Sequence, residues 1–89
     1  MPTQQRMSEK EKAASSYSGQ LHQGLFHGFG NLTYGSGEIY EGSWVKGKRE
    51  GHGVFTYLDD TVYEGEWRED KISGTGQCTF SSGNRYALL

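Results

Sequence analysis

The sequence predicts an all-β protein, an elongated single-sheet antiparallel meander of 23-residue β-hairpin repeats. Tyrosine recurs at this period, at Tyr17, Tyr40, Tyr63 and Tyr86. All 14 glycines lie between Gly19 and Gly83, and the two inner copies of one pentapeptide read YEGSW and YEGEW. A fixed period of roughly 20 to 50 residues indicates stacked repeats, and alternation of aromatic with polar residues indicates strands.

The repeats divide the chain into two parts. Three copies and the start of a fourth occupy residues 17–39, 40–62, 63–85 and 86–89. Residues 1–16 lie outside this register and are polar, with no apolar face that a helix could bury. We therefore expect a disordered N-terminal tail of residues 1–16, followed by one repeat domain of residues 17–89.

Each repeat is expected to form one β-hairpin. In the second copy, residues 40–44 and 53–57 alternate aromatic with polar side chains, which is typical of strands. The polar segment 45–50 between them is expected to be a loop. Residues 58–61 supply the aspartates of a tight turn to the next repeat, and residues 34–37 supply glycines at the matching place after the first.

The glycines predict close packing on one face of the sheet. Side chains at alternate strand positions share a face, so Tyr40, Gly42 and Trp44 point the same way. If Gly53 faces that side as well, its bare backbone leaves room for the tryptophan of the neighbouring strand to lie flat across it. Burial of aromatic side chains is the main stabilising contribution that this composition offers.

Composition excludes several classes of function. Only a third of the 89 residues are hydrophobic, which is too few for a deep catalytic cleft, and a net charge of −2 gives no broad basic field for binding nucleic acid. Cys78 is the single cysteine, and the first residues lack the apolar stretch of a signal peptide. No apolar run approaches the roughly 20 residues of a transmembrane helix. We expect a cytoplasmic protein.

No set of residues predicts catalysis, a cofactor or a metal site. Residues 42–48 match the first seven positions of a phosphate-binding P-loop, but Arg49 stands where that motif needs serine or threonine, and no helix is expected after it. The three histidines and Cys78 lack metal-ligand spacing. Glu64 and Glu66 alternate with the aromatic residues, so they should point into solvent on the opposite side of the sheet.

The repeat resembles the MORN repeat (membrane occupation and recognition nexus), whose pattern runs roughly Y-x-G-x-W-x-x-G-K-x-x-G-x-G. The matching positions of the second copy are Tyr40, Gly42, Trp44, Gly47, Lys48, Gly51, Gly53 and Phe55. The first copy departs from the pattern at Leu21, in place of tryptophan, and the third at Asp70, in place of glycine. The resemblance covers residues 17–86. It implies a curved single-sheet meander that serves as a non-enzymatic scaffold or peptide-binding module.

The aromatic face of the sheet is the predicted partner-binding site. A one-layer sheet exposes an apolar face unless something covers it, and an exposed aromatic patch rimmed by charge usually marks an interaction site. A helical or extended peptide of a partner protein would lie across this face. Alternatively, these aromatic side chains pack only against one another. The predicted binding residues are Tyr34, Tyr40, Trp44, Phe55, Tyr57, Tyr63, Trp67 and Phe80.

The same sequence predicts two alternative or additional interactions. The family's name suggests that acidic phospholipid head groups bind to basic loop residues, here Lys46, Lys48, Arg49, Arg68 and Lys71. Residues 17–89 carry six basic and nine acidic side chains, which weakens this alternative. Residues 86–89 begin an apolar last strand with an unpaired edge, through which copies of the chain could self-associate. The resemblance also implies a cytoskeletal or ciliary (axonemal) setting.

Overall fold

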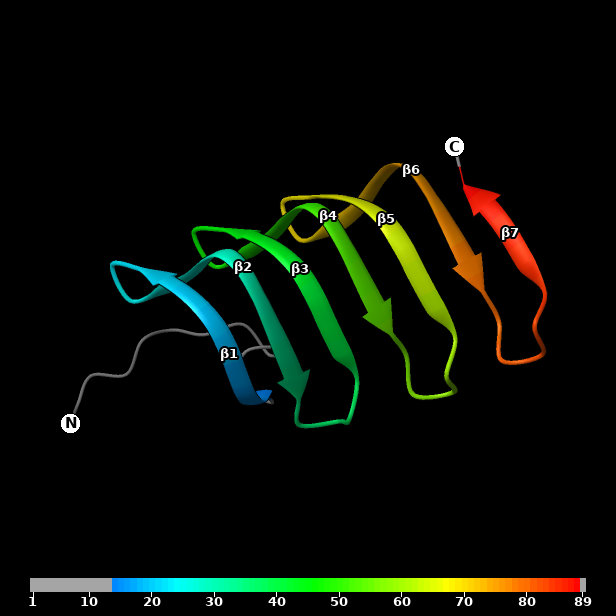
Figure 1. The fold of residues 1–89 in the computed structure, drawn as a ribbon, viewed down its shortest axis with the longest axis horizontal. Coiled ribbons are helices and arrows are strands. Elements are labelled where there is room, and N and C mark those ends of the chain that lie inside the picture. The colour runs from blue at the N-terminus through cyan, green and yellow to red at the C-terminus, as the bar shows by residue number, and fades with distance from the viewer. Residues whose placement is uncertain (1–13, 89) are drawn as a thin grey trace.

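The fold is a single antiparallel sheet of seven strands in sequence order (Figure 1). The computed structural model describes residues 14–88, with side chains for residues 16–87. The strands are β1 (Ala14–His22), β2 (Leu25–Tyr34), β3 (Ile39–Val45), β4 (Lys48–Thr56), β5 (Val62–Arg68), β6 (Lys71–Thr79) and β7 (Arg85–Leu88). No helix occurs among these described residues. The predicted single-sheet β-meander is therefore confirmed.

The first strand begins earlier than the repeat pattern indicated. Ala14 pairs with Tyr34 and Ser16 pairs with Thr33, so residues 14–16 belong to the sheet and not to the predicted tail. The reason is that β2 extends to Tyr34, and its last residues offer hydrogen-bonding groups to whatever chain lies beside them. Residues 1–13 of the predicted tail lie outside the described residues.

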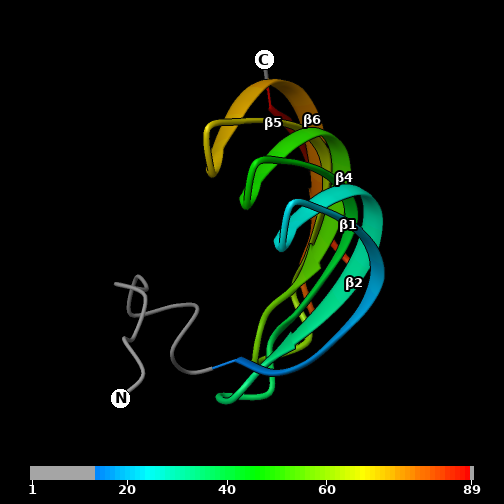
Figure 2. The same ribbon diagram turned by 90° about the vertical axis from the view of Figure 1, so that its left-hand side faces the viewer.

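The sheet is elongated and curved. Its overall dimensions are 48 × 23 × 18 Å, and the strands lie across the long axis, one behind another. Seen along that axis, the strands bend together into an arc (Figure 2). Each hairpin therefore contacts only the hairpins beside it, as in other repeat proteins.

Glycine pairs with glycine across every neighbouring pair of strands from β1 to β6. The pairs are Gly19–Gly30, Gly30–Gly42, Gly42–Gly53, Gly53–Gly65 and Gly65–Gly76. These six residues form an unbroken row across the middle of the sheet, which we call the glycine row. Because glycine has no Cβ, the row leaves the backbone of the sheet bare.

Tyrosine side chains occupy the space that the missing Cβ atoms of the glycine row leave open. The nearest atoms to a Cβ built on Gly53 are the ring and hydroxyl atoms of Tyr40, and all of them would overlap it. Tyr17 lies in the same way against Gly30, and Tyr63 against Gly76. The prediction that tryptophan covers these glycines holds only in part, because tyrosine occupies the space over their Cα atoms while each indole contacts a carbonyl of the row. Tyrosine precedes the first glycine of its own strand by two residues, so its side chain falls directly on the row.

The hairpin tips are tighter than predicted. β3 ends at Val45 and β4 begins at Lys48, so the expected loop at residues 45–50 is a two-residue turn. Lys46 and Gly47 have φ values of 50° and 84°, which is the left-handed pair that a type I′ hairpin turn requires. The polar residues that suggested a loop are mostly strand residues. The predicted turns after Tyr34 and Tyr57 are confirmed, with the amide of Gly37 bonded to the Tyr34 carbonyl at 2.9 Å.

A β-bulge explains why the glycines come in pairs. On the β3–β4 hairpin the register slips between Gly42 and Trp44, so that three residues of β3 face five residues of β4. Gly51 lies in this bulge with a φ of 91°, whereas Gly53 lies beneath Tyr40. The first glycine of the pair is required by backbone conformation and the second by packing.

Candidate protein-interaction face

The aromatic face of the sheet packs largely against itself. Six of the eight predicted binding residues are at most 5% exposed: Tyr34, Tyr40, Trp44, Phe55, Tyr63 and Trp67. Leu32 joins them in the same cluster. The rings meet mainly edge-to-face, for example Tyr63 against Trp67 with ring centroids 5.5 Å apart. These residues therefore form the core of the protein and offer little area of their own to a partner.

Each tryptophan covers the repeat that precedes it. The Nε1 of Trp44 donates a hydrogen bond to the Gly30 carbonyl at 3.1 Å, and the Nε1 of Trp67 donates to the Gly53 carbonyl at 3.3 Å. The Trp67 ring also meets Tyr40 edge-to-face, with centroids 5.4 Å apart. The buried indole N–H is thus satisfied by a carbonyl of the glycine row, which the absence of a glycine side chain leaves accessible.

Tyr17, Tyr40 and Tyr63, which lie over the glycine row and which we call the row tyrosines, are held by hydrogen bonds from their hydroxyl groups. The hydroxyl of Tyr17 donates to the carbonyl of Gln20 at 2.7 Å, and that of Tyr40 donates to the carbonyl of Ser43 at 2.9 Å. Tyr63 makes the matching bond to Glu66 at 3.2 Å. Burial raises the pKa of each of these tyrosines above its ordinary value, most strongly for Tyr40. The hydroxyls stay protonated as donors and fix the rings over the row.

Arg49 and Asp70 form an ion pair inside the aromatic cluster. Arg49 is 4% exposed, and its Nε donates to the Asp70 carboxylate at 2.7 Å. Its Nη2 donates to the Asp70 carbonyl at 2.8 Å, and its guanidinium carbon lies 4.6 Å from the centroid of the Trp67 ring. The cation is therefore paired and stacked on an aromatic face, which offsets the cost of burying it.

This pair explains a departure from the repeat pattern. Asp70 has a φ of 72°, close to the values of Gly24 and Gly47 at the equivalent positions. Aspartate tolerates this left-handed conformation better than most residues, and here its carboxylate partners Arg49. Sequence reasoning placed Arg49 in a loop, although the residues 23 positions away, Phe26 and Ile72, are both apolar. That alignment was the signal that position 49 points inward.

Hydrogen bonds join the tips of neighbouring hairpins. The amide of Gly47 donates to the carbonyl of Phe26 at 2.9 Å, and the amide of Asp70 donates to the carbonyl of Arg49 at 3.0 Å. The amide of Lys46 reaches the Nδ1 of His27 at 3.3 Å. The second and third tips are thereby held against the repeat before them.

At one position of the repeat on the aromatic face, exposure rises toward the third copy. Tyr34, Tyr57 and Phe80 occupy equivalent positions, and they are 4% exposed, half-buried and 41% exposed in turn. Ile72 is exposed, although its equivalent Arg49 is buried beneath Trp67. The C-terminal strip, as we name it, consists of Ile72, Cys78, Phe80 and Tyr86. Phe80 and Tyr86 meet edge-to-face with ring centroids 5.2 Å apart.

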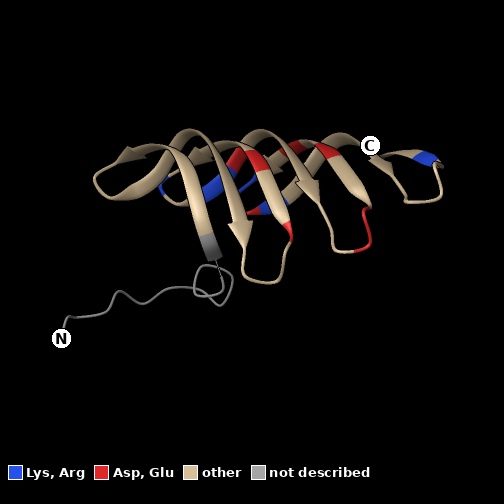
Figure 3. Cartoon of the chain, turned by 60° about the horizontal axis from the view of Figure 1, so that its bottom comes forward, with Lys and Arg blue, Asp and Glu red and all other residues tan. Residues whose placement is uncertain are grey.

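Four of the five predicted lipid-binding residues are exposed. Lys46, Lys48, Arg68 and Lys71 lie at the tips of the second and third hairpins or beside them. The fifth, Arg49, is buried and paired with Asp70, so little of it is open to a head group. Figure 3 shows basic and acidic segments close together in this part of the sheet.

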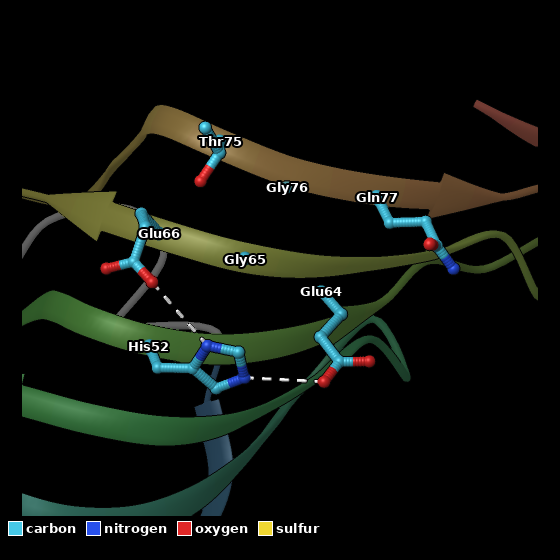
Figure 4. Close-up of a pocket in the computed structure, with 7 residues that line it drawn as sticks. All are labelled: His52, Glu64, Gly65, Glu66, Thr75, Gly76 and Gln77. Atoms are coloured by element: carbon cyan, nitrogen blue, oxygen red, sulfur yellow. Dashed lines mark ion pairs between the residues drawn. The ribbon is translucent and has the colours of Figure 1, made fainter. Parts of the chain in front are cut away.

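The opposite face of the sheet carries a shallow polar trough (Figure 4). Its volume is about 400 Å³, and bare Gly65 and Gly76 backbone lies between the side chains of its two walls. His52 spans two carboxylates, with Nε2 3.4 Å from Glu64 and Nδ1 3.6 Å from Glu66. Both glutamates are exposed, as expected from their alternation with the aromatic residues. Within residues 14–88 no group of three or more His, Cys, Asp and Glu side chains is arranged to hold a metal ion.

A curved sheet of similar hairpins, with aromatic side chains packed across the junctions between them, defines a repeat protein of the interaction-module class. The family model of the MORN repeat matches residues 17–39, 40–62 and 63–85, which is most of the chain. The protein therefore belongs to the MORN repeat family, a family of non-enzymatic modules that mediate protein and membrane interactions. No curated protein matches the chain. None of its described residues forms a helix long and apolar enough to span a membrane.

Proposed function

We propose that the chain is a non-enzymatic scaffold module that binds an apolar segment of a partner protein along the C-terminal strip. The observation that carries this proposal is the rise in exposure at equivalent positions, which leaves Phe80 with 41% of its surface in solvent. Exposed aromatic residues beside a rigid, packed surface are the usual anchors of protein interfaces. The buried aromatics of the first two repeats would then serve as the rigid platform, Phe80 as the anchor within the strip, and the half-buried Tyr57 as a further contact outside it.

The proposed setting is a cytoplasmic scaffold in a cytoskeletal or ciliary assembly. Membership of the MORN family supports a scaffolding role. A curved sheet 48 Å long could present a partner peptide along several repeats at once. An extended or helical segment with apolar residues on one side would fit the strip, because its residues lie on β6, on β7 and, for Phe80, directly after β6.

Replacing Phe80 with alanine is expected to weaken partner binding at least tenfold, because truncating an aromatic anchor typically costs about 2 kcal/mol. The partner would first be isolated by pull-down with the wild-type chain, and its dissociation constant would then be measured with purified proteins. Val45→Ala is the matched control, since Val45 is also 41% exposed but lies at a hairpin tip. Equal losses in both variants, or none in Phe80→Ala, would contradict the assignment of the strip.

A second candidate function is contact with anionic membranes. The observation in its favour is that two adjacent hairpin tips bring Lys46, Lys48, Arg68 and Lys71 together in exposed positions. Basic residues near a surface of acidic lipids contribute roughly 1 kcal/mol each. Glu69 and Asp70 on the third tip oppose this attraction, so we rank it below protein binding.

If the membrane function holds, the chain should float with phosphatidylserine-containing vesicles at low salt and be released as salt rises, because screening shortens the reach of each charge. The double variant Lys48→Glu, Lys71→Glu reverses one exposed charge on each tip and is expected to abolish flotation. Arg85→Glu, at the start of β7, is the control that should float normally. Absence of the wild-type chain from the floated fraction at low salt would remove this candidate.

A further inference from the structure

The sheet has an edge strand that lacks charge. β1 is nine residues long, and no strand within the described part of the chain pairs with its outer side. From Ala14 to Gly37 the sequence contains no Asp, Glu, Lys, Arg or Pro. Natural proteins usually place charge or proline on such an edge, because its unpaired N–H and C=O groups are a template for another strand. This edge carries neither.

The opposite edge is different. β7 is four residues long and begins with Arg85. A strand of that length offers fewer than half as many residues for pairing as β1 does. The tips of the second and third hairpins also carry charge, at Lys46 and Lys48 and at Glu69 and Lys71, whereas the first tip is Gln23–Gly24. Charge is thus absent from the β1 end of the sheet in particular.

Large apolar side chains lie exposed beside this edge. Leu21 is 60% exposed and Phe29 is 62% exposed. Leu21 occupies the position of Trp44 and Trp67, whose rings cover the preceding repeat. Among residues 14–88 no repeat precedes β1, so Leu21 has no equivalent surface to cover. A leucine at the edge of a sheet is free to cover a row tyrosine of another molecule.

We propose that two copies of the chain associate through antiparallel pairing of their β1 strands, with Gly19 opposite Gly19 of the second copy. The glycine row fixes this register, because every neighbouring pair of strands from β1 to β6 places glycine opposite glycine. Two seven-stranded sheets would become one continuous sheet. The same surface is used by both copies, so the assembly closes as a two-fold dimer.

The register also gives Leu21 a partner. With Gly19 at the two-fold axis, Leu21 of each copy stands opposite Tyr17 of the other. Within the chain, Tyr17 stacks on the Phe26 ring at 3.8 Å between centroids and meets the Trp44 ring edge-to-face at 6.0 Å. Tyr17 remains half-buried. The paired strands carry no like charges that would repel each other across the axis.

Lysine substitutions at Ser16 and Ser18 test the dimer. Both serines are exposed on β1, so Ser16→Lys, Ser18→Lys should leave the monomer folded while placing four ammonium groups at the interface. Sedimentation of the full chain under reducing conditions is expected to give a wild-type dimer whose dissociation constant rises at least about tenfold in this variant. The glutamate pair Ser16→Glu, Ser18→Glu should weaken association equally. An equimolar mixture of the two variants should restore the dimer.

The control adds two lysines at the other edge. Ser81→Lys, Ala87→Lys changes exposed positions beside and on β7 and should leave the dimer intact. A wild-type chain that stays monomeric at the highest concentration would overturn the proposal. A dimer lost in the β7 variant but kept in the β1 variant would overturn it too, and would assign association to the C-terminal edge. If the mixture of the lysine and glutamate variants did not associate, β1 pairing would be ruled out.

Discussion

Gly53→Val is expected to destabilise the chain strongly. Its side chain would have to occupy space that the Tyr40 ring fills, and Tyr40 is fully buried with its hydroxyl bonded to the Ser43 carbonyl. The ring cannot move aside without losing both its burial and that bond. We expect a loss of at least about 3 kcal/mol, a large share of the roughly 5 to 10 kcal/mol that stabilises a chain of this size.

The measurement is urea or thermal unfolding followed by circular dichroism. His52→Val is the matched control, since it adds the same side chain one position away on the same strand, where His52 is 59% exposed, and it should change stability by no more than about 0.5 kcal/mol. A second test uses the Tyr40→Leu background, in which Gly53→Val should cost markedly less because the obstructing ring is gone. An unchanged melting temperature for Gly53→Val alone would refute the packing argument.

Asp70→Ala is expected to destabilise the protein by about 2 to 3 kcal/mol. It leaves the 4%-exposed Arg49 guanidinium without its carboxylate and also places alanine at a φ of 72°. Removing one partner of a fully buried ion pair costs about 3 to 5 kcal/mol. The loss expected here is smaller because the Asp70 side chain is 35% exposed. The measurement is the free energy of unfolding in urea.

Two variants separate the causes. Asp70→Gly removes the strain of a positive φ and restores the residue of the family pattern. It should still destabilise the chain, because the ion pair is lost. Glu69→Ala is the control in the same turn, since its exposed side chain makes no bond to Arg49. If the Asp70→Gly variant were as stable as the wild type, the Arg49 charge would not need Asp70 as its partner.

The period and alternation of the sequence were sufficient to predict the sheet, the hairpins and their order. The turn at Lys46–Gly47 was missed because a segment with four charged residues among six resembles a loop, whereas strands of the sheet also accept charged residues. The covering of Gly53 by Tyr40 was missed because period two assigns a face but not the distance that a side chain reaches along it.

The candidate site was harder to predict. Alternation identified the aromatic face, but it could not separate Tyr40, which is buried between neighbouring rings, from Phe80, which stands in solvent. That difference depends on which rings the neighbouring strands supply, since Tyr40 meets both Trp44 and Trp67 whereas Phe80 meets Tyr86, and this is a property of the stack and not of one strand. Arg49 was missed because charge was given more weight than its place in the repeat.

The Arg49–Asp70 pair makes the order of the repeats non-interchangeable. Arginine stands at this position only in the second copy, and aspartate at its partner position only in the third, where the other copies have glycine. If the two copies were transposed, Asp70 would precede Arg49 instead of following it, and neither would meet the other across a junction. The hairpins share one backbone conformation, but this junction fixes which hairpin is second in the array and which is third.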